Sequence, residues 1–80
     1  MAIFVLTHEH RPHECAIAVA DWKGFARPLR HGRPLGSCRN GGHRVWWIVA
    51  ASNEAKALAL LPHYVAQRTT AEEVQEVPLP

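Results

Sequence analysis

The chain has 80 residues, of which 48% are hydrophobic and 20% are charged, and its formal net charge is +2. This composition is typical of a globular protein and excludes a disordered or fibrous chain. Eighty residues form one modest core, so we expect a single domain over residues 1–80, of a size that often gains stability from a metal, a disulfide or a partner subunit.

The chain begins with a continuously apolar segment at residues 2–6. A segment of this kind predicts a central strand that is covered on both faces. It lacks a basic flank and meets polar residues from Thr7 on, so it is too short for a signal peptide or a membrane span. We therefore expect a cytoplasmic protein that contacts no membrane.

A helix is predicted from Pro12 to about Gly24. Proline suits the first turn of a helix, and Cys15 and Trp22 recur at helical spacing on a face that points inward. Cys15 and Cys38 form no Cys-x-x-Cys pair. In a reducing compartment we expect core residues, metal ligands or reactive thiols at these two positions in preference to a disulfide.

An exposed loop is predicted at residues 25–34, where arginines alternate with prolines and glycines. No acidic residue lies between Asp21 and Glu54, so the segment is strongly basic. It is either an ordinary solvated surface or a site for a small anionic molecule or nucleic acid. The arginines of this candidate site are Arg27, Arg30 and Arg33.

Asn40-Gly41 is a strong hairpin signal, because a type I′ turn needs positive φ at both central positions. It predicts a turn between a short strand at about 35–38 and a longer strand at 43–50. In this register Cys38 faces His43, with Cβ atoms about 5 Å apart on one side of the sheet. The strand at 43–50 is continuously apolar at its centre and is therefore a second central strand.

The last part of the chain predicts a second helix and a fourth strand. Ser52 or Asn53 can cap the helix, and Pro62 should interrupt it. Near the end of the chain, Val77 and Leu79 alternate with prolines, which confines the last strand to an edge of the sheet.

The predicted order is β-α-β-β-α-β, the α+β pattern of the ferredoxin-like fold, with a four-stranded antiparallel sheet and two helices on one face. This pattern places the first and third strands in the centre, where the two continuously apolar segments fall. Two helices cover only one face of the sheet, and the other face would expose a large apolar patch. We therefore expect a homodimer that forms through that face.

The whole chain resembles the small, stand-alone members of the dimeric α/β-barrel superfamily. The resemblance rests on residues 3–8, on Gly-Gly-His-Arg-Val-Trp-Trp at 41–47, and on residues 62–69 before a terminal Val-x-x-Val-Pro-Leu-Pro. The superfamily includes monooxygenases, lactone isomerases, stress-responsive domains and small nickel-binding proteins. The resemblance implies the fold and dimerisation, and it transfers no catalytic residue set.

Histidines and cysteines gather where this topology brings the ends of several elements to one edge of the sheet. The expected set is His8, His10, His13, Cys15, Cys38 and His43, with His63 at its margin and only His31 at the opposite end. Imidazole and thiolate groups suit Ni²⁺, Zn²⁺ or copper better than Mg²⁺ or Ca²⁺. The predicted function is therefore binding of a transition metal. Its predicted ligands are His8, His10 and His43, followed by Cys38 and His13, and Glu9 and Glu14 are candidates to orient histidines.

Each of these residues also has a simpler interpretation. Cys15 is most simply a small core residue, and the histidines are ordinary exposed side chains. An enzymatic alternative uses Cys38 with His43 as a nucleophile and base, or a substrate pocket of the dimeric-barrel type. The tryptophans that would line that pocket, or equally a core or dimer interface, are Trp22, Trp46 and Trp47.

An RNA-recognition motif shares the predicted topology and stacks bases on aromatic residues of its first and third strands. This chain lacks the characteristic aromatic-glycine octamer, and both of its central strands are apolar on both faces. Nucleic acid is therefore the least favoured partner.

Overall fold

The computed structural model describes residues 1–25, 29 and 32–80. The strands are β1 (Ala2–Glu9), β2 (Leu35–Gly36), β3 (Arg44–Ala51) and β4 (Thr69–Val74), and the helices are α1 (Cys15–Lys23), α2 (Glu54–Leu58) and α3 (His63–Ala66). Two short 3-10 turns are η1 (Pro12–Glu14) and η3 (Cys38–Asn40). Arg27 and Arg30 of the candidate anion site, and His31, lie outside the described residues.

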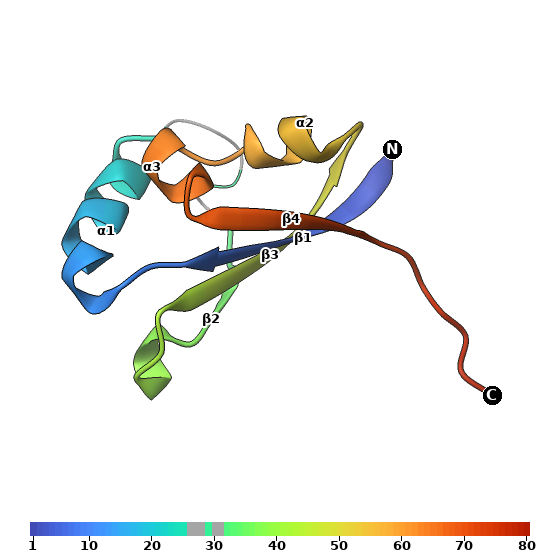
Figure 1. Cartoon of the computed structure of the whole chain (residues 1–80), viewed down its shortest axis with the longest axis horizontal. Helices are drawn as coiled ribbons and strands as arrows, with labels where there is room; N and C mark the ends of the chain where they lie inside the picture. The colour runs from blue at the N-terminus through green and yellow to red at the C-terminus, as the bar shows by residue number, and fades with distance from the viewer. Residues whose placement is uncertain (26–28, 30–31) are drawn as a thin grey trace.

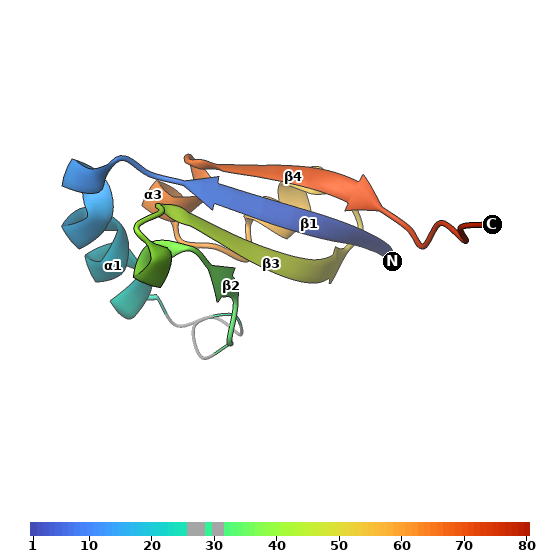
Figure 2. The same ribbon diagram turned by 90° about the horizontal axis from the view of Figure 1, so that it is seen from below.

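The fold is α+β, with one four-stranded antiparallel sheet in the order β2-β3-β1-β4. The two continuously apolar segments form the central strands β1 and β3, in agreement with the sequence analysis. Figures 1 and 2 show α1, α2 and α3 on one side of the sheet, and none of these three helices of the described residues covers the other side. This arrangement is compatible with the predicted ferredoxin-like pattern.

The sheet has a buried face and an open face, because successive side chains of a strand point in opposite directions. Along β1, Phe4, Leu6 and His8 are buried under the helices, whereas Ile3 on the other face is exposed. The core therefore lies between the sheet and the helices. Its buried members are Phe4, Leu6, Trp47, Val49, Ala51, Ala57, Leu61 and Val65.

The predicted second helix consists of two short helices. Asn53 caps α2, since its Oδ1 accepts a hydrogen bond from the backbone N–H of Lys56 at 2.9 Å. Pro62 is extended and precedes α3, so it separates the two helices as expected. Among the described residues, no helix has the length and apolar composition that crossing a membrane would require.

The hairpin between β2 and β3 differs from the prediction. Leu35 pairs with Trp46, which is the predicted offset, but the ladder ends at Gly36, and Cys38 begins the turn η3. The predicted type I′ turn is wrong. Such a turn needs positive φ at two residues, and among the described residues only Gly41 has a positive φ, at 83°. As a result, Cys38 is not paired with His43 across the sheet.

The observed turn is longer and depends on two glycines. Gly42 closes it by donating its backbone N–H to the carbonyl of Ser37 at 2.9 Å. A Cβ atom on Gly42 would overlap the Ser37 side chain, and Gly41 adopts a left-handed conformation that glycine accepts without strain. The turn places His43 at the end of the sheet where β1 finishes.

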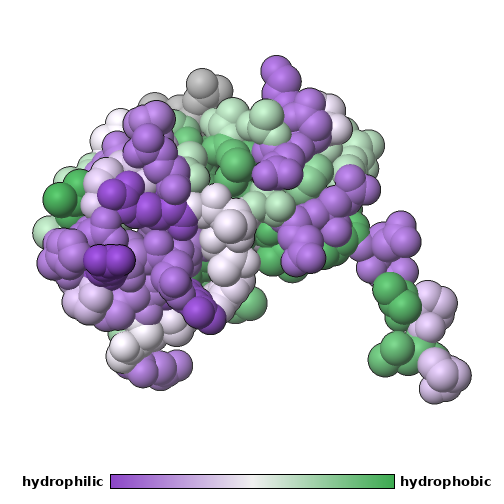
Figure 3. Space-filling model, in the orientation of Figure 1, coloured by the Kyte–Doolittle hydropathy of each residue, from purple (hydrophilic) through white to green (hydrophobic). Residues whose placement is uncertain are grey.

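The fourth strand also differs from the prediction. β4 runs from Thr69 to Val74 along β1, and Val77 and Leu79 lie in the extension beyond it, where they are 70% and 86% exposed. Residues 69–74 contain no proline and can donate a backbone N–H at every position, whereas prolines interrupt the extension. Figure 3 shows this extension projecting from the body of the molecule with hydrophobic residues along it.

Candidate metal centre

Three side chains meet at the end of the sheet where β1 finishes and β3 begins. His10 follows β1, Cys15 is the first residue of α1, and His43 precedes β3. One ligand atom from each lies within 4.8 Å of the others. The Nε2 atom of His10 is 3.0 Å from the Sγ atom of Cys15, and the Nδ1 atom of His43 is 3.5 Å from the same sulfur. We call these three residues the His-Cys-His group.

Local backbone structure explains how residues distant in sequence reach this point. The chain leaves β1 at Glu9 and turns sharply at η1, where Pro12 occupies a helical start that needs no N–H donor. The turn brings the first residue of α1 back beside the strand end. The backbone N–H of His10 also donates to the carbonyl of His43 at 3.1 Å, which ties the two histidine positions together.

His8 connects His10 of this group to Val65 and Thr69 through a continuous series of hydrogen bonds. Its Nδ1 atom lies 3.2 Å from the carbonyl oxygen of Val65 and 3.2 Å from Oγ1 of Thr69, and its Nε2 atom lies 2.9 Å from Nδ1 of His10. The hydroxyl of Thr69 donates to the same Val65 carbonyl at 2.6 Å. A carbonyl only accepts hydrogen bonds, so Nδ1 of His8 carries the proton.

This assignment determines the tautomer of His10, the next residue in the hydrogen-bonded series. With its proton on Nδ1, neutral His8 accepts at Nε2, so Nδ1 of His10 is the donor between the two rings. The Nε2 atom of neutral His10 then presents its lone pair to Cys15. This is the tautomer that a metal ligand needs, with the second ring nitrogen held by a hydrogen bond.

Burial keeps both histidines in the neutral form near pH 7. Burial is the main cause that lowers the pKa of His8 below its usual value, since desolvation penalises the charged ring. Burial also lowers the pKa of His10, and the neighbouring His43 adds to this effect. Neutral imidazole is the form that binds metals.

Glu14 braces the segment that carries Cys15. Its carboxylate accepts hydrogen bonds from the backbone N–H of Arg11 at 2.9 Å, from the Tyr64 hydroxyl at 3.0 Å and from Nε of Arg68 at 2.7 Å. These bonds, first that from Arg11 and then that from Arg68, lower the pKa of Glu14 to about 2. Glu14 thus joins η1 to α3 immediately before Cys15 in the chain.

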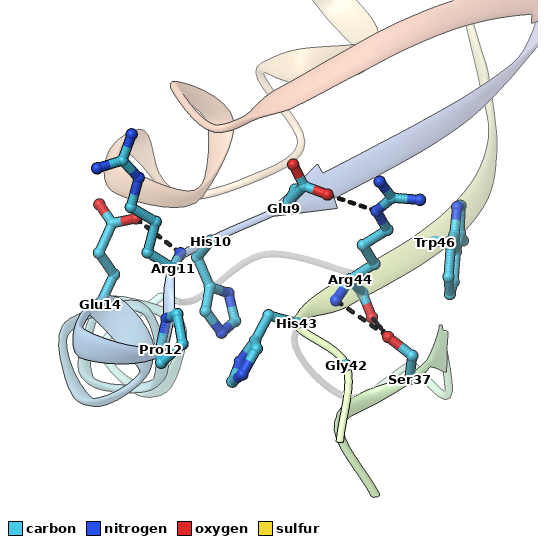
Figure 4. Close-up of a pocket in the computed structure, with 10 residues that line it drawn as sticks. All are labelled: Glu9, His10, Arg11, Pro12, Glu14, Ser37, Gly42, His43, Arg44 and Trp46. Atoms are coloured by element: carbon cyan, nitrogen blue, oxygen red, sulfur yellow. Dashed lines mark hydrogen bonds and ion pairs between the residues drawn. The ribbon is translucent and has the colours of Figure 1, made fainter. Parts of the chain in front are cut away.

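A cavity of about 690 Å³ lies beside the group, and Figure 4 shows ten residues that line it. The rings of His10 and His43 lie next to each other in it, between Pro12 and Gly42. Arg44 forms an ion pair with Glu9 in its upper wall. Two members of the His-Cys-His group are therefore reachable from this cavity.

A second, smaller cavity of about 200 Å³ lies under the helices and includes His8 and His10 in its lining. Trp22 and Trp47 also line it and stack with ring centroids 5.4 Å apart. Trp46 points to the open face, because it neighbours Trp47 on the same strand. The three tryptophans therefore do not line one common pocket, since Trp46 and Trp47 line a separate cavity of about 560 Å³, a size usual for small-molecule sites.

The structure brings together some of the predicted site residues and separates others. His8, His10, Cys15 and His43 form one hydrogen-bonded cluster. The remaining predicted residues are outside it: His13, Cys38 and His63 are exposed, on η1, η3 and α3 respectively. Glu9 and Glu14 each form an ion pair with an arginine, Arg44 and Arg68 respectively.

Cys15 is the member of the group that the sequence analysis treated mainly as a core residue. Its side chain is only partly buried. The signal that could have placed it is Pro12, because a proline-started turn puts residue 15 in the first helical turn, and side chains there lean back toward the helix N-terminus. That direction leads to the end of β1.

Comparison of the chain with known protein families, curated proteins and solved structures finds no match.

Proposed function

We propose that this protein binds a transition metal ion through His10, Cys15 and His43. The observation that carries the proposal is the meeting of three donors from three separate elements, with the sulfur of Cys15 3.0 Å and 3.5 Å from two imidazole nitrogens. Ligands of one tetrahedral Zn²⁺ ion lie roughly 3.5 Å apart, so small side-chain shifts accommodate the ion. The His8 hydrogen bond to His10 is the outer support that such ligands usually have.

The donor set favours a borderline ion, namely Zn²⁺, Ni²⁺ or copper. Zn²⁺ is the first to test, because three protein ligands and one open position are its usual arrangement where it binds exchangeable ligands. Metal binding requires Cys15 as a thiolate, so the thiol proton that faces His10 must leave. A reducing compartment such as the cytoplasm keeps both cysteines available as thiols.

Elemental analysis of untagged protein tests the proposal, together with thermal unfolding in the presence of Zn²⁺, Ni²⁺ and Cu²⁺. We expect about one metal per chain and a clear rise in Tm, since a ligand that binds only the folded state stabilises it. His10→Ala, Cys15→Ala and His43→Ala should each lose both effects. The matched controls are His13→Ala and Cys38→Ala, which remove an exposed histidine and the exposed cysteine outside the group. Absence of metal and of stabilisation in the parent protein would overturn the proposal.

A thiol enzyme is a second candidate, favoured by the order Cys15, His10, His8. A nucleophile, a base and a residue that orients the base stand in hydrogen-bond sequence at 3.0 Å and 2.9 Å. Metal-free protein should then react with a thiol-directed alkylating reagent much faster at Cys15 than at the exposed Cys38, and His10→Ala should remove the difference. Equal or slower reaction at Cys15 would exclude the enzyme.

We further propose that the fold is ferredoxin-like and that two copies pack through their open sheet faces, as the resemblance to the dimeric α/β barrels implies. Ile48 and Leu35 are 74% and 73% exposed on that face, and Ile3, Val5 and Trp46 lie beside them. A twofold dimer uses the same surface of both copies, so this apolar sheet face would pack against itself. Sedimentation should give a dimer for the parent and a monomer for Ile48→Glu; a monomeric parent at micromolar concentration would contradict the proposal.

A further inference from the structure

The large cavity reaches the metal-binding atoms from one side only. His10 and His43 line it, and Cys15 does not. A metal ion held by the three residues would therefore have its remaining coordination position on the cavity side, where the two imidazole rings lie (Figure 4). Among the described residues, no fourth histidine, cysteine or acidic side chain belongs to the group. That position takes a donor that enters from the cavity.

The charge around the cavity favours an anionic donor. Glu9 is paired with Arg44, and Glu14 is paired with Arg68, so both acidic side chains in the wall are already neutralised. A divalent ion with one thiolate and two neutral imidazoles keeps a net positive charge. The loaded cavity is therefore positive, and opposite charges attract strongly in a partly enclosed site.

Arg44 gives the cavity a group that recognises planar anions. Its Nε atom donates to Oε2 of Glu9, so the guanidinium already holds a carboxylate at the cavity wall. A guanidinium fork matches the geometry of a carboxylate and can bind it with two hydrogen bonds. An incoming carboxylate would compete with Glu9 for this side chain.

We propose that the metal centre binds a small organic dicarboxylate, of which one carboxylate coordinates the ion at its open position and the other reaches Arg44. The inference rests on the proposed function and names the ligand class of the same site. The cavity volume of about 690 Å³ exceeds what an inorganic anion needs and suits a small organic molecule. Glu9 limits the affinity, because its carboxylate occupies Arg44 in the absence of the ligand.

The test uses Co²⁺-loaded protein, whose visible spectrum reports the coordination of the ion. The thiolate-to-cobalt absorption first shows whether the metal is bound through a cysteine, and its loss in Cys15→Ala assigns that cysteine, which tests the proposed function separately. Acetate and succinate are then added. We expect a saturable change of the cobalt bands with the thiolate absorption retained, and no change with the neutral analogue acetamide.

Two variants of the ion pair give opposite expectations. Arg44→Gln should weaken succinate binding by about tenfold, since it removes charge-assisted hydrogen bonds. Glu9→Gln should strengthen it, since it removes the competing carboxylate. A merely structural role for the pair would shift both variants in the same direction. Arg39→Gln, a change in the exposed turn η3, is the matched control and should have no effect.

Three results would overturn the proposal while leaving the metal site intact. The first is a cobalt spectrum that does not respond to either carboxylate. The second is inorganic phosphate binding more tightly than succinate, which would assign the cavity to phosphate. The third is equal weakening by Arg44→Gln and Glu9→Gln.

Discussion

Replacing His8 with phenylalanine tests whether the buried histidine chain tunes the metal site. His8 is 2% exposed, and phenylalanine keeps a flat ring of similar shape in its place. The change removes the acceptor for the Nδ1 proton of His10, which lies 2.9 Å away. It does not touch any of the three proposed ligand atoms, so an effect on the metal must pass through the orientation and basicity of His10.

Loss of such an outer hydrogen bond typically lowers metal affinity by roughly 10- to 100-fold, which corresponds to about 1.4 to 2.7 kcal/mol. The free energy of unfolding of the metal-free protein should fall by less than this change in metal-binding free energy. The Val65 carbonyl keeps the hydrogen bond from Thr69 at 2.6 Å, and the buried phenyl ring adds apolar contact.

Competition of the protein with a chromophoric zinc chelator measures the affinity, and urea unfolding of the metal-free protein measures stability. The matched control is His63→Phe, the same change at an exposed histidine outside the chain. A zinc affinity within about twofold of the parent value, in a folded His8→Phe protein, would refute the coupling of His8 to the metal, since outer partners of this kind normally contribute far more.

Two further predictions concern stability. Leu6→Ala should reduce the free energy of unfolding by about 2 to 5 kcal/mol in urea titrations, because Leu6 is fully buried at the centre of the core; a loss below about 1 kcal/mol would contradict the core assignment. Glu14 has its pKa lowered to about 2 from the usual 4.5, so its contribution to stability is complete above pH 4.5 and is lost as the pH falls toward 2. Glu14→Gln should therefore show a smaller loss of stability than the parent protein over this pH window, and identical acid profiles would exclude the role of Glu14 in bracing η1.

The sequence predicted best what depends on long apolar patterns. Residues 2–6 and 45–50 are apolar without interruption, and runs of this kind are typical of the central strands of a sheet. The cap at Asn53 and the break at Pro62 were also predictable, because each follows from the local chemistry of one residue. The Thr69–Val74 strand was missed because its stability comes from pairing with β1 and not from its own apolar pattern.

The candidate site was only partly predictable for a related reason. His8 and His10 share a face by the two-residue period of a strand, so their meeting follows from sequence. The participation of Cys15 depends on the sharp turn at η1, and the separation of Cys38 depends on a turn that two glycines lengthen. Sequence spacing alone does not determine such turn geometry. The role of His8 as a support behind the group follows from contacts with Val65 and Thr69, more than fifty residues away.

The most direct test of the metal centre is the thiolate-to-metal absorption of the Co²⁺-loaded, untagged protein, measured for the parent, Cys15→Ala and Cys38→Ala. The account predicts one Co²⁺ per chain with this absorption in the parent and in Cys38→Ala, and its complete loss in Cys15→Ala. Absorption that survives in Cys15→Ala, or a parent protein that takes up no cobalt, would contradict the assignment of His10, Cys15 and His43 as the metal ligands.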